Sequence, residues 1–337
     1  MLGSDVLRFA AEGVLGVWIL VGEPRLWGFV ILAALMGTGQ AFFSPAMTGL
    51  VSQILDEENL QQGNALNGLS ESAGGVAGPA LAGVIVATSS PGWAVLVDAL
   101  SYLVSVASLA MVRVDWEVTK PGETFFILLR EGWRQFWART WLWAVVIQSS
   151  IVNVVIFAPY YVLGPEIAKK HLGGAAAWGL VLASLGAGAI AGGIVMLRVS
   201  PRRPLLFALT TTFVWAIPLV TMAITTSTVT IAIGSFLGGA AMSIFGALWN
   251  TTMQREIPPE VLSRVSAYDW FGSLAFLPLG MAIVGPVATA LGSNTVLVTA
   301  AVLTVLLTGV VLLVPAITGL QAPPASVEAP IPDMGPD

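Results

Sequence analysis

Long apolar runs separated by short polar segments dominate the chain, and this pattern predicts membrane-spanning helices. A helix needs about 20 predominantly apolar residues to cross a bilayer. Runs without a charged residue are long enough for one span at 26–55, 72–97, 140–165 and 172–197, and for two spans each at 204–254 and 270–327. Together with the first segment, we predict ten spans, over residues 4–22, 27–51, 65–88, 92–112, 142–164, 174–197, 205–226, 229–252, 266–290 and 294–315.

The composition supports an all-α polytopic membrane protein. The chain is 56% hydrophobic and 10% charged, with a mean hydropathy of +0.86. An ordinary soluble domain has about 25% charged residues. There is no cysteine and one histidine, His171, so thiolate metal sites, a cysteine nucleophile and Ser-His-Asp chemistry are excluded. We therefore expect that the protein is not an enzyme and that it binds no cofactor and no metal.

The positions of the basic residues set the orientation. With the N-terminus in the cytoplasm, eleven of the fourteen Lys and Arg residues lie on the cytoplasmic side, and Arg25, Lys169 and Lys170 lie outside. This asymmetry follows the positive-inside rule. We expect a multi-pass protein of the cell membrane with both termini cytoplasmic. The net charge of −5 reflects loop topology, and we expect the lipid bilayer and no nucleic acid as partner.

An internal repeat relates two parts of the chain at an offset of 202 residues. Gly37 then matches Gly239, and Phe43 matches Phe245. The first predicted span matches the seventh, but two further spans precede the seventh and none precedes the first. The pattern resembles a twelve-span protein without its first two spans. We expect a truncated N-terminal half of four helices, a cytoplasmic linker with an amphipathic helix, a six-helix C-terminal half and a disordered tail, at 1–112, 113–140, 141–316 and 317–337.

Three stretches resemble the major facilitator superfamily, and within it the bacterial drug- and siderophore-exporter-like branch. They are GTGQAFFSPA with the run that follows it, LREGWRQFWARTWLWAVV, and LWNTTMQREIPPEVLSRVSAYDWFGSLAFLPLG. A glycine-rich run is similar to the family's antiporter signature in Gly74, Gly78, Pro79 and Gly83, with alanine at Ala65 and Ala82. The family's glycine- and arginine-rich loop between its second and third helices is not in this chain.

This resemblance implies two pseudo-symmetric halves around a central cavity. The family's cavity helices match the second, fifth and eighth spans, which makes their polar residues candidates for substrate contact: Gln40, Gln148, Asn153 and Asn250. The cavity would be apolar with few fixed charges. No phosphate loop or ATPase motif is present, so an ion gradient would drive transport.

Ionisable residues at membrane depth are candidates for proton coupling. Glu71 in the third span is the preferred one, and Asp98 and Glu12 are the others. Each has a structural alternative, namely a hydrogen bond within a helix seam for Glu71, a solvated or capped acid for Asp98, and an ion pair with Arg8 for Glu12. The glycines of the third span are equally consistent with a packing seam.

Two charged residues near the start of the ninth span, Arg264 and Asp269, are a candidate cytoplasmic gate or cap pair. The sequence thus predicts a secondary transporter that exports a small amphipathic molecule in exchange for protons or another ion, by alternating access. The alternative is an inactive truncated remnant or a non-transporting membrane assembly partner.

Overall fold

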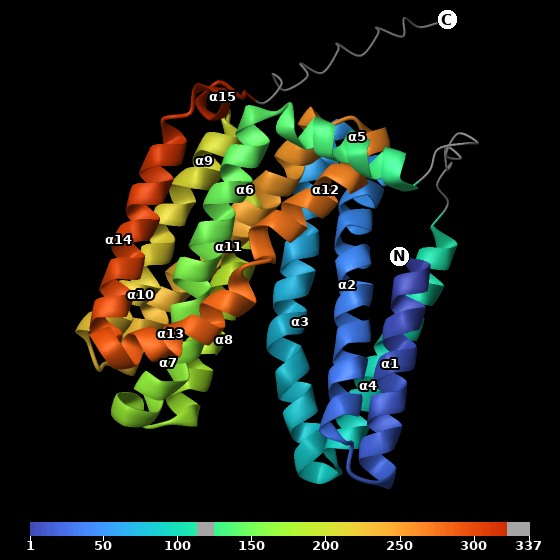
Figure 1. Ribbon diagram of the computed structural model, residues 1–337, viewed down its shortest axis with the longest axis vertical. Coiled ribbons are helices and arrows are strands. Elements are labelled where there is room, and N and C mark those ends of the chain that lie inside the picture. The colour runs from blue at the N-terminus through green and yellow to red at the C-terminus, as the bar shows by residue number, and fades with distance from the viewer. Residues whose placement is uncertain (113–124, 322–337) are drawn as a thin grey trace, which may run out of the picture.

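The computed structural model describes residues 1–112 and 125–321, and every regular element in these ranges is helical (Figure 1). The first half contains four long helices and one short turn, which are α1 (Leu2–Val21), α2 (Leu26–Ile54), η1 (Glu57–Asn59), α3 (Leu60–Thr88) and α4 (Pro91–Met111). Helix α5 (Phe125–Trp137) follows and lies across one end of the bundle. We call this end the linker end and the opposite one the far end.

The second half begins with a segment that is continuously helical to Leu172. It consists of α6 (Thr140–Val152), η2 (Asn153–Phe157), α7 (Ala158–Ile167) and η3 (Ala168–Leu172). Five further segments follow, which are α8 (Ala175–Met196), α9–η4–α10 (Pro204–Thr211, Thr212–Trp215, Ala216–Ile224), α11 (Thr228–Glu256), α12–α13 (Pro259–Leu274, Leu277–Leu291) and α14 (Ser293–Leu312).

These helices confirm the predicted all-α membrane architecture. Within the described ranges, nine helical segments are long and apolar enough to cross a membrane. Helix α1 has comparable length but holds Asp5, Arg8 and Glu12, and it packs between α2 and α4. The fifth span is longer than predicted, because the helix continues through Lys169 and Lys170 to a left-handed turn at Gly173, with φ of 95°.

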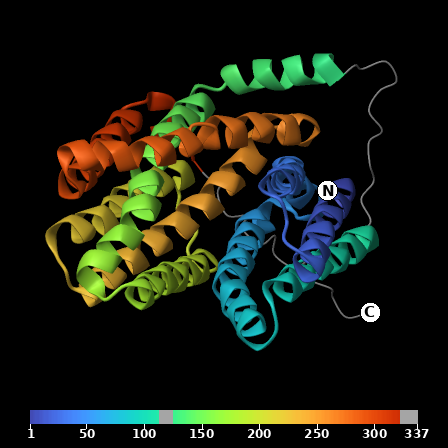
Figure 2. The same cartoon turned by 60° about the horizontal axis from the view of Figure 1, so that its bottom comes forward.

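The repeat is visible in the helix boundaries. Leu2 and Pro204, Leu26 and Thr228, and Pro91 and Ser293 each begin equivalent helices, and each pair is 202 residues apart. The four long helices of the first half therefore correspond, in the same order, to the last four segments of the second half. The first segment of the second half and α8 have no counterpart among the described residues of the first half. Figure 2 shows α1 to α4 gathered beside the larger second half.

Helix α8 and helix α11 pack most closely, through small residues. A side chain at Gly188 would meet the carbonyl oxygen of Phe236, and one at Gly239 would meet that of Leu185. Small residues allow helix backbones to approach closely in lipid. These glycines of the second half therefore allow α8 and α11 to pack closely.

The matching faces of the first half are open. Gly37 is the counterpart of Gly239, yet no atom lies within 4 Å of a side chain built there. Gly78 is the counterpart of Gly280. A side chain at Gly280 would meet Val154 in the second half, whereas one at Gly78 would meet no atom within 4 Å. The faces of α2 and α3 that hold these two glycines are uncovered.

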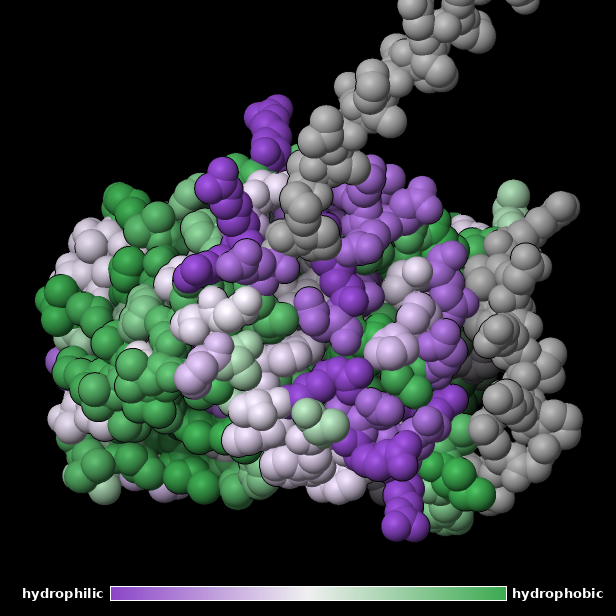
Figure 3. Space-filling view, turned by 90° about the horizontal axis from the view of Figure 1, so that it is seen from above, coloured by the Kyte–Doolittle hydropathy of each residue, from purple (hydrophilic) through white to green (hydrophobic). Residues whose placement is uncertain are grey.

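Hydrophilic residues gather on the linker end, which faces the viewer in Figure 3, and hydrophobic residues surround them. The short helix α15 (Pro315–Thr318) lies there, and its residue Ile317 is fully buried. The predicted disordered tail starts at 317, so its first residues are packed, and its remainder from 322 lies outside the described residues. The part of the predicted linker at 113–124 also lies outside them.

Candidate functional site

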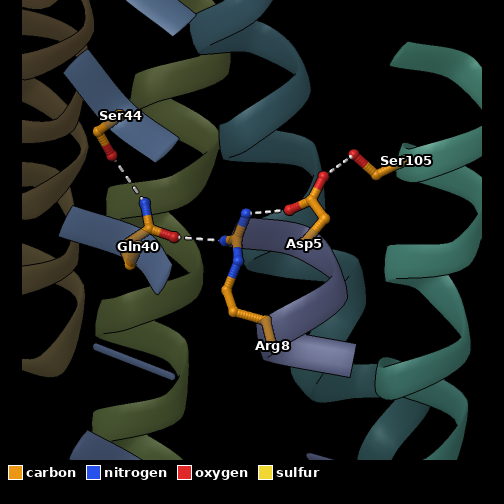
Figure 4. Close-up of polar contacts among 5 residues, drawn as sticks. All are labelled: Asp5, Arg8, Gln40, Ser44 and Ser105. Carbon is orange, nitrogen blue, oxygen red and sulfur yellow. Dashed lines mark hydrogen bonds and ion pairs between the residues drawn. The ribbon is translucent and has the colours of Figure 1, made fainter. Parts of the chain in front are cut away.

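A buried polar cluster joins three helices of the first half (Figure 4). Arg8 pairs with Asp5 one turn earlier on α1, and its Nη1 donates to Gln40 Oε1 on α2 at 2.6 Å. Ser105 on α4 donates to Asp5 Oδ2 at 2.6 Å, and Gln40 Nε2 donates to Ser44 Oγ at 2.9 Å. Buried charges persist when they are paired and hydrogen-bonded. Asp5 and Arg8 satisfy this requirement.

Two aromatic rings enclose the Arg8 guanidinium. Its central carbon lies 4.4 Å from the ring centroid of Phe43 on α2 and 4.7 Å from that of Tyr102 on α4. A guanidinium over an aromatic face gains electrostatic attraction that increases when water is excluded. Arg8 is therefore the residue that connects α1, α2 and α4.

Glu12 lies one turn further along α1 and is 4% exposed. Its carboxyl group lies near that of Asp98 on α4, which is exposed, and its Oε2 has no hydrogen-bond partner within the described residues. The sequence alternative was a pair with Arg8, but Arg8 is bonded to Asp5 and Gln40. A facing pair of carboxyl groups is an arrangement that can take up and release a proton.

Glu71 lies on the uncovered face of α3. It is exposed and accepts a hydrogen bond from Asn67 Nδ2 at 3.0 Å, one turn earlier on the same helix. The antiporter-like residues Gly74, Gly78, Pro79 and Gly83 continue along α3, and the three glycines have open space around them. The structure thus brings Glu71 and this motif together on one helix.

The four predicted substrate contacts have different surroundings. Gln40 belongs to the Arg8 cluster. Gln148 is buried inside the second half, with its Nε2 3.4 Å from Thr308 Oγ1, and Asn153 donates to the Ser273 carbonyl at 2.9 Å. Asn250 on α11 is half-buried.

Arg264 and Asp269 do not pair with each other. Arg264 Nη1 lies 2.7 Å from Glu131 Oε2 on α5, whereas Asp269 is buried and accepts from Trp249 Nε1 at 3.1 Å. Residues five positions apart lie about 140° apart around a helix, so they face different neighbours. The expected pair is replaced by two separate contacts.

The side-chain hydrogen bonds between the two halves are made by other polar residues, at the linker end. Asn64 Nδ2 on α3 donates to Thr251 Oγ1 and Gln254 Oε1 on α11, at 2.9 and 2.6 Å. Gln254 Nε2 donates to the Thr48 carbonyl on α2 at 3.1 Å, and Gln61 Nε2 donates to the Val199 carbonyl at 2.6 Å. This network was not predicted from the sequence, because Gln61, Asn64 and Gln254 carry no charge.

All inter-half side-chain hydrogen bonds found among the described residues lie at the linker end. Besides those of Gln61, Asn64 and Gln254, Arg255 Nη2 donates to the Glu57 carbonyl at 3.2 Å. At the far end, the last turns of α3 and those of α13 are largely exposed. The hydrogen bonds between the halves therefore gather at one end of the bundle, whereas the packing of α3 on α8 continues as far as Val76 and Gly186.

Two repeated helical halves, with ionisable groups buried inside the first one, are the arrangement of a polytopic membrane transporter. A profile of the Major Facilitator Superfamily matches residues 1–273. The chain belongs to this family.

Relatives and solved structures agree with this assignment. The chain is 26% identical over 306 residues to the uncharacterized MFS-type transporter YvqJ of Bacillus subtilis (strain 168), covering 88% of this chain and 72% of that one. It is 21% identical over 303 residues to macrolide efflux protein A of Streptococcus pyogenes, covering 87% and 74%. The structure of the E. coli fucose:proton symporter FucP matches with a TM-score of 0.65 at 14% identity, over 92% of this chain and 82% of that one.

Proposed function

We propose that this transporter exports a small amphipathic molecule in exchange for protons by alternating access. The observation that carries the proposal is the amide network of Gln61, Asn64 and Gln254, because all side-chain hydrogen bonds between the halves within the described residues lie at the linker end. Alternating access requires two halves that meet at one end of a central path while the other end is open. An end closed by hydrogen bonds, opposite an end without them, fits one state of such a cycle.

Two observations support export of an apolar or amphipathic substrate. A relative matched over most of this chain is a macrolide efflux protein. In addition, an open groove of about 340 Å³ lies on the second half between the far-end parts of α8 and α11, with one hydroxyl among largely exposed apolar side chains: Leu180, Ser184, Val229, Ala232, Ile233 and Phe236. Binding sites for such molecules are mainly apolar with few polar groups.

Three carboxyl groups support proton exchange. Glu12 is buried against Asp98 between α1 and α4, and Glu71 lies on α3 at membrane depth. Acids at this depth are costly and characterise proton relays in transporters. We assign proton uptake and release to these groups, with the linker end and both termini on the cytoplasmic side of the cell membrane.

Transport into proteoliposomes tests the proposal. The purified chain is reconstituted, a pH gradient is imposed, and accumulation of a labelled macrolide is followed together with the lumenal pH. We expect drug movement that dissipates the gradient and stops when a protonophore is added. Drug movement that is unaffected by the protonophore would contradict proton exchange, and no movement in either direction would contradict transport.

A non-transporting membrane assembly partner is the second candidate. It is favoured by the uncovered faces of α2 and α3 at Gly37 and Gly78, whose counterparts Gly239 and Gly280 are covered. Such open faces in lipid suit association with further helices. Stable co-purification of another membrane protein, together with the absence of transport, would support this candidate.

A further inference from the structure

Helix α5 is fixed to the bundle by one face. Glu131 forms an ion pair with Arg264 on α12 at 2.7 Å, and Tyr268 donates its hydroxyl to the Leu129 carbonyl at 2.9 Å. Gly132 lies so close to α12 that a Cβ there would be 3.0 Å from Arg264 Cβ. These contacts set the rotation of α5 about its own axis, so the direction of its other face is defined.

The other face combines arginines with large apolar side chains. Arg130 and Arg134 are one turn apart and exposed, and neither pairs with a carboxylate within the described residues. Ile127 and Trp137 are 57% and 46% exposed beside them, and Trp133, 48% exposed, lies at the edge of this face with its ring centroid 5.2 Å from that of Tyr268 on α12. Residues three and four positions apart share a helix face. We call this set of five residues the outward face of α5.

The outward face lies at the depth where the fifth membrane span begins. Helix α6 starts at Thr140, only three residues after the end of α5, and the ring centroids of Trp137 and Trp143 are 5.6 Å apart. Tryptophan is enriched at the membrane–water boundary because its ring is apolar while its N–H is polar. Helix α5 therefore runs along the membrane surface.

We propose that the outward face of α5 binds the phosphate groups of anionic phospholipids. Exposed tryptophan and isoleucine suit the boundary between headgroups and acyl chains, and arginine beside them suits the headgroup phosphate. A guanidinium can donate two parallel hydrogen bonds to one phosphate. Arg130 and Arg134, one turn apart, hold one or two headgroups while the indole rings enter the upper acyl region. This proposal does not depend on the transported substrate.

Lipid titration of the purified full chain tests it. Binding of phosphatidylglycerol is followed by native mass spectrometry in detergent, with phosphatidylcholine of the same acyl chains as the comparison. We expect preferential binding of phosphatidylglycerol that weakens at high salt. The double substitution Arg130→Gln/Arg134→Gln should weaken this binding about 10- to 30-fold, and Arg130→Lys/Arg134→Lys should retain most of it.

The matched control removes two exposed arginines from the loop between α8 and α9 at the same end, as Arg202→Gln/Arg203→Gln. Equal loss of binding in the control and the α5 variant would overturn the site, as would equal binding of the two lipids by the unaltered protein. If the glutamine variant does not fold, the test rests on the unaltered protein. A preference for phosphatidylglycerol that weakens at high salt then supports the proposal, and the lack of such a preference overturns it. Unchanged lipid binding together with loss of a co-purifying protein would assign the face to a protein partner instead.

Discussion

Asn64 on α3 donates a hydrogen bond of 2.6 Å to Gln254 on α11, and both side chains are buried where the two halves meet. Gln254 in turn donates to the Thr48 carbonyl on α2. One amide thus connects three helices from both halves. Removing the side-chain amide of Asn64 or of Gln254 would leave buried hydrogen-bonding groups of the other residue without this partner.

The substitution Asn64→Ala should open the linker end. An unsatisfied buried amide costs about 1–3 kcal/mol, which corresponds to a shift of roughly 5- to 100-fold in the ratio of closed to open molecules. Because the chain has no cysteine, spin labels can be attached at Asp56→Cys and Arg202→Cys without background. The distance distribution between the labels should broaden toward longer values. Ser70→Ala, which removes only a bond within α3, should leave it unchanged.

Glu71→Gln should abolish efflux driven by a pH gradient while insertion into the membrane is retained. The amide can accept the hydrogen bond from Asn67 but cannot bind and release a proton. The measurement is drug efflux from proteoliposomes with and without the gradient. Glu166→Gln removes an exposed carboxylate that pairs with Lys170, and it should leave efflux unaltered. Normal gradient-driven efflux in Glu71→Gln would remove this residue from the mechanism.

Glu12→Gln and Asp98→Asn should each slow proton-coupled transport, and the double variant should be no slower than the worse single one. Residues that act as one unit show such non-additive effects. We expect each single variant to lose at least about tenfold in rate, the range that general acid–base groups contribute. Proton flux is measured with a pH-sensitive dye inside the vesicles. Additive losses would show that the two carboxyl groups act independently.

Gly239→Val should destabilise the protein, whereas Gly37→Val should not, although the two positions are equivalent in the repeat. A side chain at Gly239 would collide with the Leu185 carbonyl on α8, and one at Gly37 meets no atom within 4 Å. Overpacking of this kind costs about 1–3 kcal/mol. Thermal unfolding in detergent should show a lower Tm for the first variant only. A similar loss in both would mean that the Gly37 face is also covered.

The membrane architecture could be predicted from sequence because it depends on local chemistry. The length of an apolar run predicts a membrane span whichever helices pack against it. The repeat offset of 202 residues likewise separates Leu26 and Thr228, where two equivalent helices begin. Clustered arginines and tryptophans likewise indicate an amphipathic helix before the fifth span. These features require no knowledge of which helices touch.

The contacts of the candidate site could be predicted only in part, because they depend on helix rotation and on partners distant in sequence. Asn64 and Gln254 are 190 residues apart, and neither carries a charge that would mark it as a functional candidate. Arg264 and Asp269 were expected to form a pair because they are close in sequence, yet they face α5 and α11. Glu12 and Asp98 were each predicted as intramembrane acids, but their proximity became evident only from the packing of α1 on α4.

The amide network at the linker end is built mainly from neutral groups. Hydrogen bonds between Asn64, Gln254 and the Thr48 carbonyl have no net charge, so dissolved ions do not screen them and acidification does not break them. Proton binding at a distant carboxyl can therefore release this end only by displacing the helices mechanically and admitting water between the amides. The stability of the shut conformation should accordingly vary with ionic strength only through the ion pair between Arg255 and Glu57.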